Sequence, residues 1–522
     1  FGGTVTIASL FKRGFDHVSI AVGAGLPRAL PVPGSLAPGM RQANDFLMAL
    51  QLTGAARENS LANLQLRLPA IVIGGGLTGV DAATEAQAYY IKQVEKALFR
   101  YEKLCEHQSE ARVKAQFSAK DLMVLEEFLA HGRLVKKERE QATKEKRLPD
   151  FIRLIQSWGG VTIVYRKTMQ ESPAYVLNHE ELYKALEEGV YYLESMQPAL
   201  ALLDEVGHVR AMGFKKQVKN EGGEWVETDE RIDVPAKSIL VATGASPNVA
   251  YDFEHPHELK RHKMQYLAYE QTEKGLTHVP TARHVKEEKF GAFTSFDRKD
   301  ERVSFVGDVH PLFHGSVVNA VTSAKRVYPK VLDLFSSNET PRKNGDDYAD
   351  FSKRMQQDFQ ATVVEIVRRS DNIIELDICA PIAAERFQPG EFFRLQNYET
   401  RAQQAAGTLL QTEPLALLAC GVNKKAGTLK FMVIERGVSR RLLSTLKKGD
   451  AVALMGPTGI RSKIPDDRQN ILIIGNQLGL AYVRAVADRL REKNNRVMFL
   501  GYFNHPDECF CREEIERCTD EV

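Results

Sequence analysis

Short apolar runs that end at or near a glycine recur along the N-terminal part of the chain, and they predict strands that lead into tight turns. These runs cover residues 18–24, 69–73 and 238–248. The run at 69–73 enters a glycine-rich turn and then an apolar-periodic segment from about residue 78 to 90, which together predict a β-turn-α unit. We expect the neighbouring strand at 161–165.

The interval between those two strands is far longer than the dozen or so residues that one crossover needs. It therefore predicts inserted helices over about 91–150. Ser118, followed by Asp121, is typical of a capped helix start. Residues 133–147 mix Arg, Lys and Glu densely, which indicates a solvated helix face or, alternatively, a docking surface for a partner.

The pattern changes after residue 335. A polar segment at 336–347 contains Pro and Gly and is the best candidate for a domain linker. Short β-type runs with turn residues between them fill 359–455 and predict a small antiparallel barrel. The remaining predicted elements are a helix at 40–48, strands within 190–235, a strand-loop-helix unit at 303–335, and a second β-turn-α-β unit made of 471–474, 480–493 and 496–501.

Composition narrows the class of protein. The 522 residues suffice for about three or four domains, and 43% hydrophobic with 26% charged residues is ordinary for a globular chain. A formal net charge of +2 gives no general attraction to nucleic acid. The sequence shows no apolar run long enough to cross a membrane, and we expect no signal peptide. Six cysteines without a CxxC pair indicate a reducing, cytoplasmic location.

The glycine-rich turn carries the most specific chemistry. Gly74, Gly76 and Gly79 fit the GxGxxG pattern, in which the first glycine permits the tight turn, the second lets the backbone approach a pyrophosphate, and the third lets helix and strand pack closely. The helix start then faces the phosphate charge. Because the motif follows an apolar strand and opens a helix, we predict a dinucleotide site here that also includes Gly75 and Thr78.

The strand at 161–165 ends in Tyr165 and is followed by Arg166 and Lys167. In a dinucleotide-binding fold the end of this strand lies beside the adenosine ribose, where an acidic residue would favour NAD. Two cations suit a 2′-phosphate instead, so we predict NADPH as the cofactor. The alternative is that both are ordinary surface cations.

Together with the glycine motif and residues 161–167, the segments 171–174 and 181–189 resemble the small (beta) subunit of glutamate synthase and its relatives. The resemblance spans roughly residues 1–335. It implies an FAD domain into which a nicotinamide domain is inserted. It also implies flavin contacts at five positions, which are Gly23, Gly244, Gly307, Asp308 and Ser316.

Two departures from that family matter. The family's first glycine fingerprint, which holds the FAD adenylate, is absent and would lie before Phe1. The helical insertion is also longer than usual. Since the chain starts without methionine in mid-fold and stops at Val522 with few elements after the last strand, we expect it to be a fragment of a longer polypeptide.

Residues 356–522 resemble ferredoxin-NADP reductase-type modules, especially the electron-transfer subunit of dihydroorotate dehydrogenase. The matching segments are 388–393, 437–439, 449–450, 456–459 and 475–479. Where that family has an arginine that meets the flavin phosphate, this chain has Glu413, which would repel it. Asn476 and Gln477 crowd a turn that is usually glycine-rich. The module is therefore either a nucleotide-binding domain or a degenerate docking domain.

Some polar residues remain open to two interpretations. His310 and His314 follow the Gly307 turn and could hydrogen-bond the flavin or relay a proton, or could be polar loop residues. Cys509, Cys511 and Cys518 do not form a cluster signature, so no metal site is predicted.

These inferences define a fold class and a function. The fold class is α/β: a two-dinucleotide-binding-domain flavoprotein with a helical insertion, then a small antiparallel β-barrel and a partial Rossmann-like domain. The expected domains are 1–50 (part of the FAD domain), 51–240 (NAD(P)H-binding, with the insertion 91–150), 241–335 (the rest of the FAD domain), 336–355 (linker), 356–465 (flavoreductase-like barrel) and 466–522 (partial nucleotide-binding domain).

The expected function is that of an FAD-dependent NADPH oxidoreductase, an electron-input module that passes electrons to an iron–sulfur segment or an acceptor protein. The cofactor carries the hydride chemistry, so no catalytic acid or base is predicted. A pyrimidine- or sulfide-linked reductase and a non-catalytic docking scaffold are the alternatives.

Overall fold

The computed structural model describes residues 1–281, 284–298, 301–336, 345–466 and 468–522. These residues form two compact units. We call Gly25–Ser246 the inner unit, and Phe1–Ala24 together with Pro247–Val522 the outer unit. Both contain helices and sheets, so the mixed α/β class is confirmed. No helix in the described ranges is long and apolar enough to cross a membrane.

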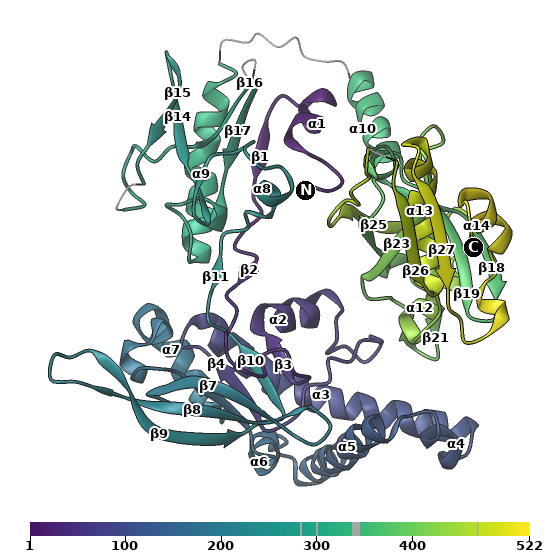
Figure 1. Cartoon of the computed structure of the whole chain (residues 1–522). Coiled ribbons are helices and arrows are strands. Elements are labelled where there is room, and N and C mark those ends of the chain that lie inside the picture. Colours follow the sequence, from purple (N-terminus) through teal and green to yellow (C-terminus); the bar gives the residue numbers. More distant parts are fainter. Residues whose placement is uncertain (282–283, 299–300, 337–344, 467) are drawn as a thin grey trace. The chain divides into compact units, whose positions relative to one another are not determined.

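The inner unit is built on a five-stranded parallel sheet (Figure 1). In spatial order its strands are β3 (Met40–Gln42), β10 (Ser238–Val241), β4 (Ala70–Ile73), β5 (Val161–Val164) and β6 (Tyr191–Leu193). All four residues of β4 are buried, because the strand is central and both sheet faces are covered.

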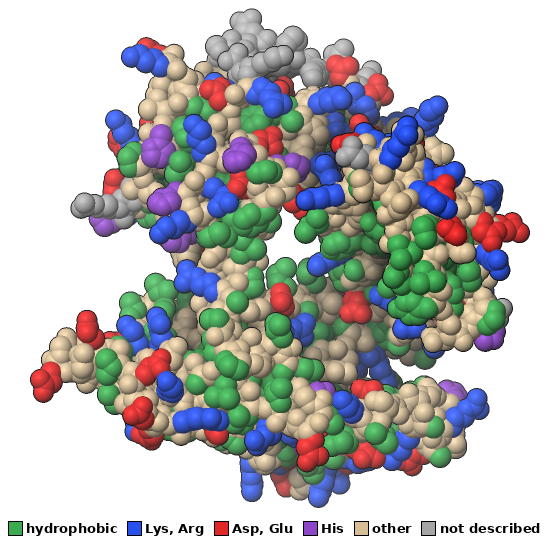
Figure 2. Space-filling model, in the orientation of Figure 1, with side chains coloured by type: hydrophobic (Ala, Val, Ile, Leu, Met, Phe, Trp, Pro, Cys, Tyr) green, Lys and Arg blue, Asp and Glu red, His purple; other side chains and the backbone are tan. Residues whose placement is uncertain are grey.

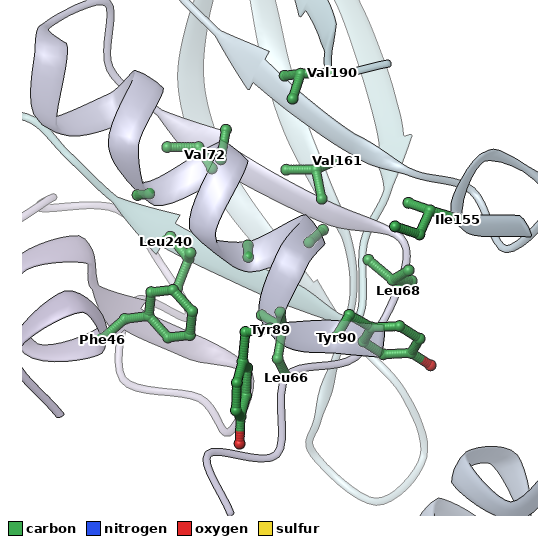
Figure 3. Close-up of a cluster of buried hydrophobic side chains, with 14 of the residues drawn as sticks. Phe46, Leu66, Leu68, Val72, Tyr89, Tyr90, Ile155, Val161, Val190 and Leu240 are labelled. Carbon is green, nitrogen blue, oxygen red and sulfur yellow. The ribbon is translucent and has the colours of Figure 1, made fainter. Parts of the chain in front are cut away.

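Alternate residues of β4 enter two different cores. Ala70 and Val72 pack among the helices, in the cluster that Figure 3 shows around Phe46 and Tyr89. Ile71 and Ile73 pack on the other face, against a three-stranded antiparallel sheet. That sheet consists of β7 (Met196–Leu203), β8 (Val209–Lys219) and β9 (Trp225–Pro235).

The helical insertion is a long antiparallel pair. The helix after the glycine turn is α3 (Leu77–His107), and α5 (Ala119–Glu145) packs along it. The Ser118 hydroxyl caps α5 by accepting from the amide of Asp121, as the capping pattern predicts. The expected end of the first helix at residue 90 is wrong. Its buried face continues through Val94, Leu98 and Tyr101, so the periodic apolar positions extend the helix into the insertion.

The remaining helices of the inner unit are shorter. They are α2 (Ala43–Leu52), α4 (Glu110–Lys114), α6 (Phe151–Ser157) and α7 (Pro173–Glu187). The expected helix at 40–48 begins three residues late, because Met40–Gln42 form an edge strand whose pairing with β10 overrides local preference.

The first part of the outer unit is a five-stranded mixed sheet with α9 (Val317–Asp333) packed nearby (Figure 1). Its spatial order is β1 (Val18–Ile20), β17 (Glu301–Phe305), β16 (Phe293–Arg298), β14 (Ala268–Thr272) and β15 (Gly275–Val279). β1 pairs with β17 in parallel, which joins the N-terminal segment to a strand far away in sequence.

The C-terminal part of the outer unit contains a closed antiparallel barrel, as the sequence predicts. Its strands, in order, are β18 (Ala361–Ser370), β19 (Ile373–Cys379), β24 (Thr428–Ile434), β23 (Leu415–Asn423), β20 (Phe392–Asn397) and β25 (Ala451–Thr458). Of the expected linker, residues 337–344 lie outside the described residues. The stretch 345–355 is helical, since α10 spans Gly345–Phe359.

After the barrel come two parallel strands, β26 (Asn470–Gly475) and β27 (Arg496–Gly501), joined by α13 (Gln477–Glu492). One face of this pair packs on α13, while Leu472, Ile474 and Leu500 on the other face are each more than half exposed. Figure 2 shows hydrophobic side chains gathered over this region. Parallel strands are usually covered on both faces.

Candidate nucleotide-binding site

The glycine turn between β4 and α3 is fixed by contacts within the inner unit. The amide of Gly74 donates to the carbonyl oxygen of Val164 on β5 over 3.0 Å. A Cβ atom at Gly74, where φ is +143°, would collide with the carbonyl oxygen of Ala242. At Gly79 a Cβ would lie 2.5 Å from the carbonyl oxygen of Gly74. The fold itself therefore requires glycine at 74 and 79.

Gly76 differs from these two residues. A Cβ atom built there meets nothing within 4 Å, so packing inside the protein does not require glycine at this position. Gly76 is also the N-cap of α3, and no side chain caps the helix. The first amides of a helix have no partner within the helix, so they are available to an anion. The space beside Gly76 suits a pyrophosphate.

Gly75 is enclosed by the Tyr165 side chain on one side and by the start of α7 on the other. A Cβ at Gly75 would lie 2.6 Å from the Tyr165 ring, so the ring lies directly against this glycine. The carbonyl oxygen of Gly75 accepts from the amide of Ala174 at the start of α7, over 2.9 Å. Ser172 caps that helix by accepting from the amide of Tyr175. Thr78 lies in the first turn of α3, beside the uncapped end.

Arg166 and Lys167 follow β5 and carry the predicted 2′-phosphate contacts. Arg166 is exposed and Lys167 is half-buried. Neither forms an ion pair with a carboxylate in the part of the chain that the structure describes. The carbonyl oxygen of Lys167 accepts from the amide of Ser195, which anchors the loop. Two cations without carboxylate partners can take an anionic ligand, and their assignment to a phosphate stays a prediction.

The predicted flavin contacts of the outer unit lie after β17. The amide of Gly307 donates to the Ser323 hydroxyl of α9 over 2.7 Å. One carboxylate oxygen of Asp308 accepts from the amide of Gly315 over 2.8 Å, which closes the loop before α9. Ser316 is the N-cap of α9, and its hydroxyl accepts from the amide of Asn319. The Asp308–Gly315 hydrogen bond thus holds Asp308 close to Ser316, the residue that follows Gly315.

The other two predicted flavin contacts lie at turns, one in each unit. Gly23, with φ +66°, accepts from the amide of Asn248 over 2.8 Å. Gly244, with φ +97°, accepts from the amide of Arg28 over 2.9 Å. A Cβ atom would meet nothing within 4 Å at either glycine, so each is required by its backbone conformation rather than by packing.

His310 and His314, the two histidines that follow the Gly307 turn, differ in solvent exposure. His310 is fully buried, its Nε2 lies 3.0 Å from the carbonyl oxygen of Gly291, and its Nδ1 accepts from the amide of Leu312. Burial lowers the pKa of His310 to about 4. Because both ring nitrogens are occupied by backbone groups, neither interpretation of His310 is right: it is a neutral core residue. His314 is exposed and both interpretations stay open for it.

In the barrel the Glu413 carboxylate accepts from the Ser439 hydroxyl over 3.3 Å. The Asn476 side chain caps α13 by accepting from the amide of Leu478. Gln477 is buried. The contacts of Glu413 and Asn476 use protein groups where the family resemblance would expect nucleotide contacts. All six cysteines are free, and within the described ranges no group of three or more His, Cys, Asp and Glu side chains is placed to hold a metal.

No family model matches the chain. An uncharacterized protein of Rickettsia prowazekii is 31% identical over 512 residues, which are 96% of this chain and 62% of that protein. A homolog of the electron transfer subunit of dihydroorotate dehydrogenase B (NAD(+)) from Thermotoga maritima is 24% identical over 159 residues, 30% of this chain and 52% of that protein. The chain thus spans less than two thirds of the length of these two relatives.

Among solved structures, FprA of Mycobacterium tuberculosis in complex with NADPH is 14% identical and has a TM-score of 0.35, covering 68% of this chain and 73% of that chain. A likeness at that score does not establish a common fold. The resemblance to the dihydroorotate dehydrogenase subunit is confirmed. The resemblance to the small subunit of glutamate synthase stays a prediction.

The sequence analysis assigned no role at the site to three residues that surround the glycine turn. The Tyr165 ring lies against Gly75, Ala174 ties α7 to the turn, and Glu171 binds groups from a distant hairpin. The sequence does place Tyr165 at the end of the strand and Ser172 with Pro173 at a helix start. It does not reveal that this helix start meets Gly75.

Proposed function

We propose that the protein is an FAD-dependent NADPH oxidoreductase that passes electrons from NADPH through FAD to an iron–sulfur centre or an acceptor protein, as the small subunit of glutamate synthase does. The observation that carries the proposal is the open space at Gly76, at the uncapped start of α3. The similarity of part of the chain to a homolog of the electron transfer subunit of dihydroorotate dehydrogenase B (NAD(+)) supports it.

The inner unit would bind the nicotinamide cofactor. The pyrophosphate would lie at Gly76, where the amides of α3 donate to its oxygens and the helix dipole favours its charge. Arg166 and Lys167 would hold the 2′-phosphate, with the guanidinium offering a fork of donors and the ammonium a point charge. Gly75 and Thr78 would contribute backbone and hydroxyl contacts at the same turn.

The outer unit would hold the flavin. Asp308 keeps one carboxylate oxygen free of the Gly315 contact, and that oxygen can accept from a ribityl hydroxyl. Val317 and Val318 at the start of α9 are 80% and 74% exposed, an apolar surface that an isoalloxazine ring could cover. The outer-unit residues therefore fit the flavin end of FAD, with Gly23 and Gly307 at turns.

When bound, the two cofactors supply the hydride chemistry between them. The protein contributes binding, orientation and exclusion of water. No side chain has to give or take a proton for this step, so the site needs no acid or base beside the cofactors.

Anaerobic mixing of the natural full-length protein with NADPH, and separately with NADH, tests the proposal. The visible flavin absorbance should bleach with NADPH in preference to NADH. A flavin that neither reductant bleaches, or a protein without flavin, would refute the reductase function and favour a docking scaffold.

A second candidate is a pyrimidine- or sulfide-linked reductase built on the same modules. The similarity to the dihydroorotate dehydrogenase subunit favours it. Screening acceptors with the NADPH-reduced protein distinguishes the two, since only the second candidate would turn over a pyrimidine or a sulfur compound.

A further inference from the structure

The distal part of the β8–β9 hairpin lies beside the loop that carries Arg166 and Lys167. The amide of Ser195 donates to the carbonyl oxygen of Lys167 over 3.0 Å, and the carbonyl oxygen of Ser195 accepts from the amide of Gln217 over 2.7 Å. One residue thus links the two segments. In Figure 1 this hairpin extends past α7.

Glu171 fastens the hairpin to the loop. One carboxylate oxygen lies 3.2 Å from the Lys219 ammonium and accepts from the indole nitrogen of Trp225 over 3.5 Å. The other accepts from the Thr168 hydroxyl over 2.8 Å. The Thr168 hydrogen bond, with those from Lys219 and Trp225, holds the pKa of Glu171 below its ordinary value. Glu171 is therefore ionised at neutral pH and neutralises Lys219.

Lys219 and Trp225 face each other across the hairpin. They are paired in register, and the ammonium lies 5.3 Å from the centroid of the indole ring. The Lys219 side chain is 48% exposed and Trp225 is half-buried. An accessible indole offers a stacking surface for a purine, and an ammonium binds phosphate as a point charge. Both groups border the loop where the adenosine 2′-phosphate is proposed to lie.

The charges favour an exchange of partners at Lys219. A phosphate monoester carries about −1.5 to −2 at neutral pH, whereas the Glu171 carboxylate carries a single charge. Arg166 and Lys167 would draw that phosphate to the loop. Once held there, the phosphate would attract the Lys219 ammonium more strongly than the singly charged Glu171 carboxylate does, and the exposed ion pair with Glu171 is weak.

We propose that Trp225 and Lys219 form the outer wall of the adenosine 2′-phosphate end of the cofactor site. Trp225 stacks on the adenine, and Lys219 exchanges the Glu171 carboxylate for the 2′-phosphate. This inference rests on the proposed NADPH site and adds the residues that select the phosphorylated cofactor.

Tryptophan fluorescence tests it directly, because the chain has two tryptophans and Trp158→Phe leaves Trp225 alone. The full-length protein is titrated with 2′,5′-ADP and with 5′-AMP, while equilibrium dialysis measures binding independently. Trp225 fluorescence should change in parallel with binding of both ligands. If Trp158→Phe does not fold, the difference between the wild-type signal and that of Trp225→Phe gives the same information.

Substitutions then separate the roles. Lys219→Met should weaken 2′,5′-ADP about tenfold and leave 5′-AMP unchanged, whereas Glu171→Gln should strengthen 2′,5′-ADP several-fold. Lys215→Met is the matched control, since Lys215 pairs with Glu227 in the same hairpin at 3.2 Å, and it should change neither affinity.

Two outcomes overturn the inference and differ in what they say of the enzyme. In the first, dialysis shows binding of 2′,5′-ADP that neither alters Trp225 fluorescence nor responds to Lys219→Met. That result would show that Trp225 and Lys219 do not contact the cofactor, and it would leave the proposed function intact. If dialysis shows no binding and NADPH does not bleach the flavin, both the inference about Trp225 and Lys219 and the proposed function are wrong.

Discussion

The amide of Ala174 donates to the carbonyl oxygen of Gly75 over 2.9 Å, so the start of α7 is fastened to the middle of the glycine turn. The turn is thus held from two directions, since Gly74 is bound to β5 through Val164. Gly76 differs from the other glycines of the turn, because a Cβ atom added there would meet no protein atom within 4 Å. The roles of the glycines in folding and in binding can therefore be tested separately.

Gly76→Ala should weaken NADPH binding at least about tenfold, roughly 1.4 kcal/mol, because the methyl group enters the space proposed for the pyrophosphate. Its melting temperature should stay close to that of the wild type, since the methyl group meets no protein atom within 4 Å. Equilibrium dialysis with NADPH and a thermal melt measure the two effects.

Gly79→Ala is the matched control. Its methyl group would lie 2.5 Å from the Gly74 carbonyl oxygen, so the variant should lose about 1–3 kcal/mol of folding stability. If Gly76→Ala unfolds as readily as Gly79→Ala, or binds NADPH with unchanged affinity, the assignment of Gly76 to the ligand is wrong.

Replacing Arg166 and Lys167 together by Ala should remove the preference for NADPH over NADH. Hydrogen bonds to charged groups contribute about 1.5–3 kcal/mol, so KM for NADPH should rise roughly 10- to 100-fold. KM for NADH should change little, because it has no 2′-phosphate. Steady-state flavin reduction with both cofactors measures this.

Replacing Lys137 and Lys144 together by Ala removes the same number of positive charges from exposed positions of α5, and this charge-matched control should leave both KM values unchanged. An equal loss of NADPH and NADH activity in the double variant would mean that the two cations support the fold rather than the phosphate.

The central strands and the glycine turn could be predicted from the sequence, because they depend on local patterns. The continuous apolar run of β4 is what a strand buried on both faces requires. By contrast, β3 spans three residues, and its identity comes from pairing with β10, which is distant in the sequence. The hairpin of β14 and β15 has a weak alternation and was not predicted.

In the candidate site, too, some residues could be recognised from local sequence patterns and others could not. Gly74, Gly76 and Gly79 are recognisable from spacing, and Arg166 with Lys167 from their place after a strand. The contact of Tyr165 with Gly75 depends on how neighbouring strands end, which no local pattern encodes. The burial of His310 was likewise invisible, because a histidine after a turn has the same sequence signal whether it faces water or the core.

His310 predicts a pH dependence of stability. Its folded pKa of about 4 lies below the ordinary 6.5, so between these values the unfolded chain binds a proton that the folded chain does not. The stabilisation is complete above pH 6.5 and is lost as the pH falls toward 4, at most about 3 kcal/mol. His17, whose pKa burial also lowers to about 4, acts in the same direction.

Urea unfolding at pH 7 and pH 5 measures this loss. His310→Gln keeps a donor and an acceptor but cannot titrate, so its stability should fall less between the two pH values. If the variant and the wild type lose the same stability on acidification, His310 is not a buried neutral residue. Unchanged flavin reduction by this variant would agree with its position in the core.

A buried charge cluster predicts how the barrel and α13 are held together. Glu375 on β19 is 1% exposed and is hydrogen-bonded by Arg369 and Arg484. Burial alone would raise the pKa of Glu375, but the hydrogen bonds from Arg484 and Arg369 hold it below its ordinary value. Arg484 lies on α13 and also pairs with Glu514, so its two ion pairs connect a barrel strand, α13 and the helix α14 (Arg512–Cys518).

Glu375→Gln should destabilise the outer unit by about 1–3 kcal/mol, because the Arg484 guanidinium, whose side chain is 12% exposed, loses one of its two carboxylate partners. Hydrogen–deuterium exchange of β19 and α13 should increase together, since the cluster links them. Glu516→Gln is the control: it breaks the exposed i,i+4 pair with Arg512 and should change stability by less than about 0.5 kcal/mol. Equal effects of the two substitutions would show that Glu375 does not join the barrel to the helix.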